Sequence, residues 1–267
     1  ILILLSILPV THFLFIIPFS HFSDFLGKKF IGTIGIIFSV FGFFLLSTIS
    51  FFPENYLTWI AVLGIAIFGV GTAMNIAPWF ALIHPIIPEN IRGRFFGRLR
   101  LTWQSFSVLL TLVAISILER YPTLMMYQAV MGFVTILLAI RLIFYQRIPE
   151  LERKVSKKKT FWESFLKVLA IPEYLPFCAY CFLLTLFTGA CPQIFNLIEK
   201  DVLQLPKIDI IFIGNLLILG ALAGFYLGGR MVDKFGTKYV FFLCHFGFGA
   251  VVFLFLWREI FPGEIKI

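Results

Sequence analysis

The chain has 267 residues, of which 60% are hydrophobic and only 13% carry a charge, and its mean hydropathy is +0.98. Soluble domains contain about 25% charged residues because their exteriors face water. The composition therefore excludes an ordinary soluble protein and indicates an integral membrane protein. The net charge of +8 is explained by basic loops that lie near anionic lipid, so it does not require a nucleic-acid partner.

Stretches without Asp, Glu, Lys or Arg divide the chain into predicted membrane spans. A transmembrane helix needs about 20 mostly apolar residues, with about 18 as a minimum. Helices are expected because an open strand in lipid leaves its backbone groups unpaired. The predicted fold class is therefore all-α, a polytopic membrane helical bundle. The eight predicted spans are 1–23, 30–53, 55–88, 101–118, 121–140, 174–198, 210–229 and 239–257.

The basic residues fall mainly on one side of these spans. Of the 22 Lys and Arg residues, 17 lie on that side and five on the other. Positive-inside bias places the basic side in the cytoplasm, so we expect a protein of the cytoplasmic (inner) membrane whose basic loops face the cytoplasm. The basic side holds Lys28, Lys29, Arg92, Arg94, Arg98, Arg100, the segment 141–167, Arg230, Lys234 and Lys238.

The longest predicted cytoplasmic segment contains a short helix signal. Thr160 and Glu163 have the spacing of a capping box, and apolar residues follow at helical spacing. Two interpretations remain open. The helix lies on the inner membrane surface with its apolar face in lipid, or it is an ordered linker helix without lipid contact.

One loop type occurs twice. HFSDFLGKKF at 21–30 and GGRMVDKFGTK at 228–238 align on Asp24 and Asp233, which are 209 residues apart. In this alignment Gly27 matches Gly236, and six predicted spans lie between the copies. A loop that recurs after six spans indicates two six-helix halves. Its carboxylate can accept backbone N–H bonds at a neighbouring helix N-terminus or pair with a nearby basic residue.

These loops resemble the signature of the major facilitator superfamily of secondary transporters, roughly G-x-x-x-D-R/K-x-G-x-R/K. The second copy fits throughout, whereas the first has Ser20 in place of Gly and Phe25 in place of a basic residue. IPENIRGRFFGRLR, at 87–100, resembles the family's R-G-x-x-x-G turn. The resemblance implies helices two to nine of twelve, without helix one and helices ten to twelve. It implies part of the N-terminal half at 1–145, a linker at 146–172 and part of the C-terminal half at 173–267.

In the family these loops act as cytoplasmic latches between the halves. The alternative is a positive-inside turn that only fixes topology. The resemblance assigns to the latch Asp24, Gly27, Lys28, Lys29, Arg92, Gly93, Arg94, Gly229, Arg230, Asp233, Lys234, Gly236 and Lys238.

Polar side chains inside spans are costly unless they face protein or a water-filled cavity. By resemblance, the spans expected to line the cavity contain Asn75, Trp79, Gln104, Gln193, Asn196 and Asn215. Each amide can equally satisfy a neighbouring backbone group. A small-residue stripe at Gly220, Gly224 and Gly228 favours close helix packing. No charged residue is expected deep in a span, which disfavours drug–proton antiport.

The favoured function is a secondary active or facilitative transporter that moves a small-molecule solute by alternating access, with membrane lipid and a coupling ion as further partners. The alternative is a transporter-like membrane sensor or scaffold without flux. A membrane-embedded enzyme is disfavoured because His12, His21, His84 and His245 have no paired spacing. We expect no catalytic residues, metal site or cofactor.

Overall fold

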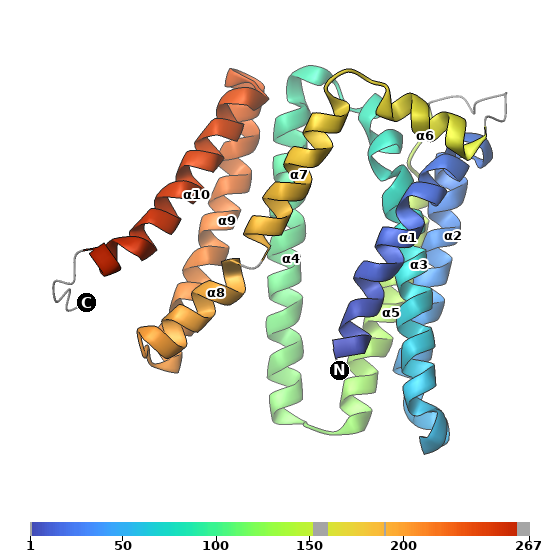
Figure 1. Ribbon diagram of the computed structural model, residues 1–267. Helices are drawn as coiled ribbons and strands as arrows, with labels where there is room; N and C mark the ends of the chain where they lie inside the picture. Colours follow the sequence, from blue (N-terminus) through green and yellow to red (C-terminus); the bar gives the residue numbers. More distant parts are fainter. Residues whose placement is uncertain (1, 152–159, 190, 261–267) are drawn as a thin grey trace. The chain divides into compact units, whose positions relative to one another are not determined.

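The computed structural model describes residues 2–151, 160–189 and 191–260. These residues form helices joined by short turns, with no strand in the described ranges. The helices are α1 (Leu2–Leu26), α2 (Lys28–Ser47), α3 (Leu57–Ile83), α4 (Arg92–Arg120), α5 (Leu124–Gln146), α6 (Phe161–Leu169), α7 (Tyr174–Thr188), α8 (Cys191–Leu197), α9 (Lys207–Phe235) and α10 (Thr237–Ile260) (Figure 1).

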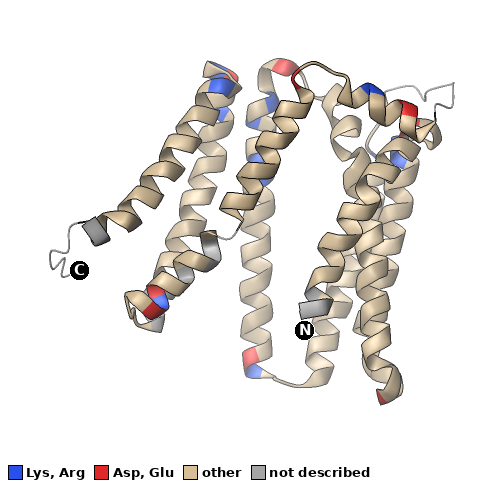
Figure 2. Cartoon of the chain, viewed as in Figure 1, with Lys and Arg blue, Asp and Glu red and all other residues tan. Residues whose placement is uncertain are grey.

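The helices confirm the predicted all-α membrane bundle. In the described part of the chain, seven helices are long and apolar enough to cross a membrane, or up to eight if the bent pair α6–α7 counts as one span. Charged residues lie mostly toward helix ends and turns, while the middle stretches of the helices are uncharged (Figure 2). This distribution is the one expected when the middle of each helix lies in hydrocarbon.

The predicted span at 174–198 is wrong as one continuous helix. Helix α7 is 15 residues long and ends at Thr188, and α8 begins at Cys191. Gly189 and Pro192 flank this break. Glycine is a weak helix former, and proline, which has no N–H to donate, is favoured in the first turn of a helix, where Pro192 lies in α8. At the N-terminal end of α7, the chain bends by 87° between α6 and α7.

Helix α5 corrects the predicted position of Arg141. The prediction ended the span at residue 140 and placed Arg141 in a cytoplasmic segment, but α5 continues to Gln146. Arginine is a good helix former, so a charged residue does not by itself end a helix. Arg141 therefore lies within α5, five residues before its end, rather than in the segment that follows the span.

The short helix α6 has the predicted cap. Glu163 accepts a hydrogen bond from the Thr160 backbone N–H at 3.1 Å, and the reciprocal bond completes the capping box. Trp162 and Leu166 are 64% and 61% exposed, whereas Phe161 packs edge-on against His21 of α1. Whether the exposed apolar side chains contact lipid stays a prediction.

Contacts group the chain into two compact units, 1–86 with 111–195 and 87–110 with 196–267. Helix α4 contributes its first part to the second unit and its last part to the first. This grouping follows contacts rather than chain order. The predicted division at 1–145, 146–172 and 173–267 therefore stays a prediction.

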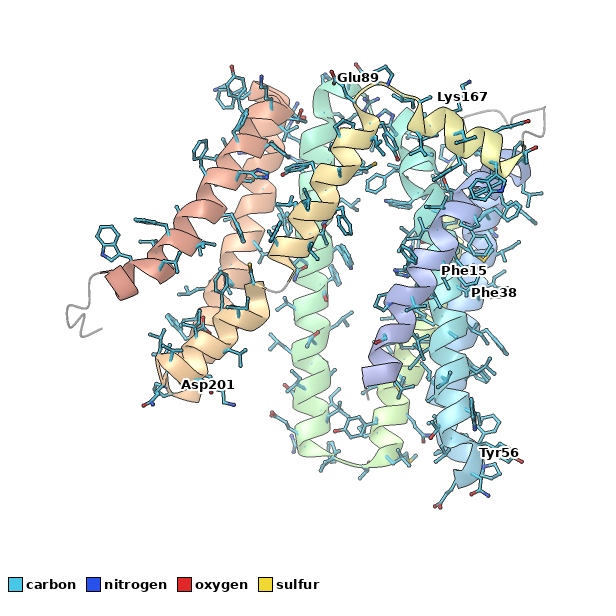
Figure 3. The ribbon with its side chains drawn as sticks, viewed as in Figure 1. Phe15, Phe38, Tyr56, Glu89, Lys167 and Asp201 are labelled. Carbon is cyan, nitrogen blue, oxygen red and sulfur yellow. The ribbon has the colours of Figure 1, made fainter. Side chains whose placement is uncertain are left out.

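The core of the first unit lies where α2 packs against both α3 and α5. Ile36, Leu82 and Tyr145, one from each helix, are 1%, 2% and 3% exposed. Phe38, on the same helix as Ile36, is 43% exposed (Figure 3). An apolar inner face and an apolar outer face are the pattern of a helix that packs on protein on one side and on lipid on the other.

Glycines let the backbones of α2 and α3 touch. A Cβ added at Gly35 would lie 2.6 Å from the carbonyl oxygen of Gly71, and a Cβ at Gly71 would lie 2.5 Å from the backbone nitrogen of Ser39. No side chain fits at such distances. Close approach through small residues is a main source of helix association in membranes, where no hydrophobic force drives one helix onto another.

We expect Gly71→Ala to lower the free energy of unfolding by about 1–3 kcal/mol, because the added methyl forces the two backbones apart. Gly132→Ala on α5 is the matched control, since nothing lies within 4 Å of its added Cβ. Thermal unfolding in detergent measures both. Equal unfolding temperatures for the two variants would contradict the close packing of α2 on α3.

Candidate functional site at the glycine corners

Both predicted loops are single-glycine corners between long helices. Gly27 alone separates α1 from α2 with φ 107° and ψ 136°, and Gly236 alone separates α9 from α10 with φ 84° and ψ 163°. Their N–H groups donate to the carbonyl four residues earlier, at 3.0 Å to Ser23 and 2.9 Å to Val232. Positive φ favours glycine strongly, so the sequence alignment paired two residues with the same unusual conformation.

Within the second unit, the Asp233 carboxylate binds the first turn of α4. One carboxylate oxygen accepts a hydrogen bond from the Gly93 backbone N–H at 2.7 Å. The other accepts from the Arg94 backbone N–H at 2.9 Å and from Arg94 Nε at 3.0 Å. The Asp233 side chain is 9% exposed and that of Arg94 48% exposed. One acidic side chain thus provides the acceptors for three donors.

Helix physics explains why this carboxylate is stabilised there. The first N–H groups of a helix have no partner within the helix, and the helix dipole makes its N-terminus electropositive. Helix α4 follows a short 3-10 turn at Glu89–Ile91, where no side-chain cap forms. Asp233, 140 residues later in the chain, supplies the missing acceptors together with negative charge.

Three glycines bring the two helices close enough for this contact. A Cβ at Gly93 would lie 2.5 Å from the Gly229 carbonyl oxygen, and a Cβ at Gly229 would lie 2.6 Å from that of Gly93. A Cβ at Gly97 would lie 2.5 Å from the Phe225 carbonyl oxygen. The R-G-x-x-x-G turn and the first glycine of the signature loop therefore face each other. Gly97 was not among the predicted latch residues, although the motif contained it.

The predicted packing stripe lies one residue away from the glycine that makes the contact. Nothing lies within 4 Å of a Cβ added at Gly220, Gly224 or Gly228. No other described residue of the second unit packs closely against these glycines, and their packing against a further helix stays a prediction. Spacing identified a small-residue face, but not which neighbouring face meets the partner helix.

Among the basic residues predicted for the latch, Arg94 is the one whose side chain contacts Asp233 in the described part of the chain. Arg92 donates to the Ile87 carbonyl and to Glu89, both at 3.2 Å. Arg230 stacks over the Tyr226 ring at 4.2 Å. Lys234 lies over the Phe235 ring at 5.1 Å, and Lys238 is exposed.

The first corner uses a different acid. The Lys28 backbone N–H, at the start of α2, donates to Glu150 Oε1 at 2.7 Å, and Lys28 is 9% exposed. Asp24 is exposed, and no hydrogen bond or ion pair joins it to another described residue; Lys29 is half-buried. Sequence reasoning missed Glu150. The available signal was an acid just past the end of α5, on the same predicted side as the start of α2.

A family model described as Major Facilitator Superfamily matches residues 1–263. The chain belongs to the major facilitator superfamily. It is therefore an integral membrane protein of a transporter family. No match was found among curated proteins or among solved structures.

In this major facilitator chain, Asn75 packs inside the first unit. It is 4% exposed, its Nδ2 donates to the Gly32 carbonyl at 3.4 Å, and its Oδ1 accepts from Arg141. Asn75 therefore satisfies a neighbouring backbone group, which was the stated alternative to lining a cavity. Trp79 is half-buried against the core of Ile36, Leu82 and Tyr145.

The other cavity candidates are less constrained. Gln104 on α4 is half-buried and Asn215 on α9 is exposed. Gln193 and Asn196 belong to α8, but their side chains lie outside the described residues. Cavity lining stays a prediction for these positions.

We expect Asp233→Asn to destabilise the protein by about 1–3 kcal/mol, because hydrogen bonds to a charged group are stronger and an amide also presents a donor to Arg94. Asp201→Asn is the control, since Asp201 is exposed. Thermal unfolding in detergent compares the two. The contact would have no energetic importance if Asp233→Asn unfolded at the wild-type temperature.

Proposed function

We propose that this protein is a secondary transporter that moves a small solute across the cytoplasmic membrane by alternating access. The contact of Asp233 with the start of α4 serves as its cytoplasmic latch. This contact is the observation that carries the proposal, because it joins segments that the predicted division assigns to different halves. The start of α4 belongs to the predicted N-terminal half, and the α9–α10 corner belongs to the C-terminal half.

The chemistry of the contact suits a latch that opens and closes. A hydrogen bond to a charged group contributes about 1.5–3 kcal/mol net, so this contact is strong enough to bias an equilibrium between two states. It is also partly open to solvent, because the Arg94 side chain is 48% exposed. Water replaces its hydrogen bonds when it separates, which keeps the cost of opening moderate.

The charge distribution supports the orientation. Of the 22 basic residues, 17 fall on the side that holds both glycine corners, and positive-inside bias assigns that side to the cytoplasm. Closing the Asp233 contact on this side would close the cytoplasmic entrance and favour the outward-facing state.

Uptake by proteoliposomes that carry the full chain tests the transport proposal. The assay covers sugars, amino acids, nucleosides and organic acids, each with and without a proton or sodium gradient. Accumulation of a solute above empty liposomes supports transport, and dependence on a gradient identifies the coupling ion. Solute binding without flux would favour a membrane sensor and reject the transporter proposal.

Asp233→Asn should shift the protein toward the inward-facing state, because it weakens the contact that holds the cytoplasmic side closed. A single Gln104→Cys substitution serves as the reporter, in a background where Cys178, Cys181, Cys191 and Cys244 are replaced by Ser. Labelling by a membrane-impermeant maleimide from the cytoplasmic side should become several-fold faster. Asp201→Asn should leave the labelling rate unchanged. Unchanged labelling with Asp233→Asn would reduce the corner to a topological turn.

A further inference from the structure

Arg141 is a fixed positive charge on α5 whose guanidinium reaches α3. It lies five residues before the end of α5 at Gln146, about 8 Å along the axis at 1.5 Å per residue. Side chains on a helix lean toward its N-terminus, which for Arg141 means away from the near end of α5. Its guanidinium donates to Oδ1 of Asn75, which lies eight residues before the end of α3, or about 12 Å. Arg141 therefore does not snorkel toward the near surface.

Arg141 has no carboxylate partner among the described residues. The ion pairs there join Arg92 to Glu89 and Arg94 to Asp233. Asn75 offers a neutral oxygen, which orients the guanidinium but does not balance its charge. A guanidinium carries five N–H donors, and Arg141 is exposed, so donors remain accessible beyond the one that binds Asn75.

A second unpaired donor lies one turn away. The Tyr145 hydroxyl is buried without a hydrogen-bond partner among the described residues, and Tyr145 is 3% exposed. It abuts Gly32 of α2, whose carbonyl accepts from Asn75. Asn75 and Tyr145 therefore meet the same turn of α2, and Arg141 joins them through Asn75. A buried donor without an acceptor costs about 1–3 kcal/mol, so this cluster has positive charge and hydrogen-bond donors in excess.

We propose that Arg141, oriented by Asn75 and flanked by Tyr145, binds an oxyanion, either a carboxylate or a phosphate group. Arginine is the side chain best suited to such groups, because its planar fork forms two parallel hydrogen bonds to them. Where the oxyanion belongs to the transported solute, the inference rests on the proposed function and makes the substrate an anion. A lipid phosphate has the same chemistry, and the experiment separates the two sources.

The first test is ligand-dependent thermal unfolding of the full chain in a neutral detergent. The probes are inorganic phosphate and succinate, with glucose as a neutral control, at ionic strength held constant with sodium chloride. We expect phosphate or succinate to raise the unfolding temperature of the wild type. Any effect of glucose should be the same in the wild type and in Arg141→Gln. Arg141→Gln should weaken the apparent affinity by about tenfold or more, as the loss of a charge-assisted hydrogen bond implies.

Two further variants keep the test independent of misfolding. Asn75→Asp preserves the shape of the side chain but places a carboxylate against the guanidinium, so anion binding should be lost while the unliganded protein stays folded. Arg147→Gln removes a nearby positive charge that stacks on Phe144, and it should bind like the wild type. Equal loss in Arg147→Gln would mean general charge attraction and would overturn the site.

The second arm identifies the source of the oxyanion. Wild type and Arg141→Gln are reconstituted in nanodiscs of phosphatidylcholine alone or mixed with phosphatidylglycerol. Arg141-dependent stabilisation by phosphatidylglycerol, without stabilisation by phosphate or succinate, assigns the site to a lipid headgroup. Arg141-dependent stabilisation by the soluble anions assigns it to a solute. If neither phosphatidylglycerol nor the soluble anions stabilise the protein through Arg141, the inference is overturned, even if the liposomes take up a neutral solute. If an anion binds but the liposomes take up no solute, only the transport proposal is overturned.

Discussion

The first turn of a helix leaves backbone N–H groups without partners inside the helix, and an acceptor from elsewhere must satisfy them. In this chain the start of α4 meets that constraint with a carboxylate from Asp233, 140 residues away. An aspartate side chain is short, so the two backbones must nearly touch for it to reach. Gly93 and Gly229 are the consequence, because any Cβ there would meet a carbonyl oxygen. The acid and the glycines therefore act together, because the glycines allow the close approach that the hydrogen bonds of Asp233 require.

The other corner repeats the backbone but not the partner. Gly27 and Gly236 share positive φ and the same hydrogen bond to the residue four earlier. At the start of α2, however, the acceptor is Glu150, which follows α5, rather than a residue of a distant corner. The duplicated element is thus a helix–glycine–helix turn with an acidic residue ahead of it. What that turn contacts depends on the helices around it.

Sequence reasoning succeeded where a property depends on residue type. The absence of charge located most spans, and positive φ explains why the two corners both need glycine. Arg141 was misplaced because counting charges ends a span at the first charged residue, although an arginine can lean toward Asn75 and stay inside the bundle. At Gly220, Gly224 and Gly228 the spacing identified a small-residue face, but the face of α9 that meets α4 is the one with Gly229, because α4 itself determines which face it contacts. Glu150 was missed for the same reason, since its role requires knowing that α2 begins beside it.

The two glycine-lined contacts differ in what it takes to separate them. Between α2 and α3, backbones touch at Gly35 and Gly71 beside the buried Ile36. Separation there would open an apolar gap and lose many dispersion contacts that water does not replace. At Gly93 and Gly229, separation exposes a carboxylate and two N–H groups, all of which water solvates well. A protein that alternates between two conformations needs both kinds of contact, one that keeps helices together as a body and one that breaks at moderate cost. The position of the acid, rather than the position of the glycines, distinguishes the second kind from the first.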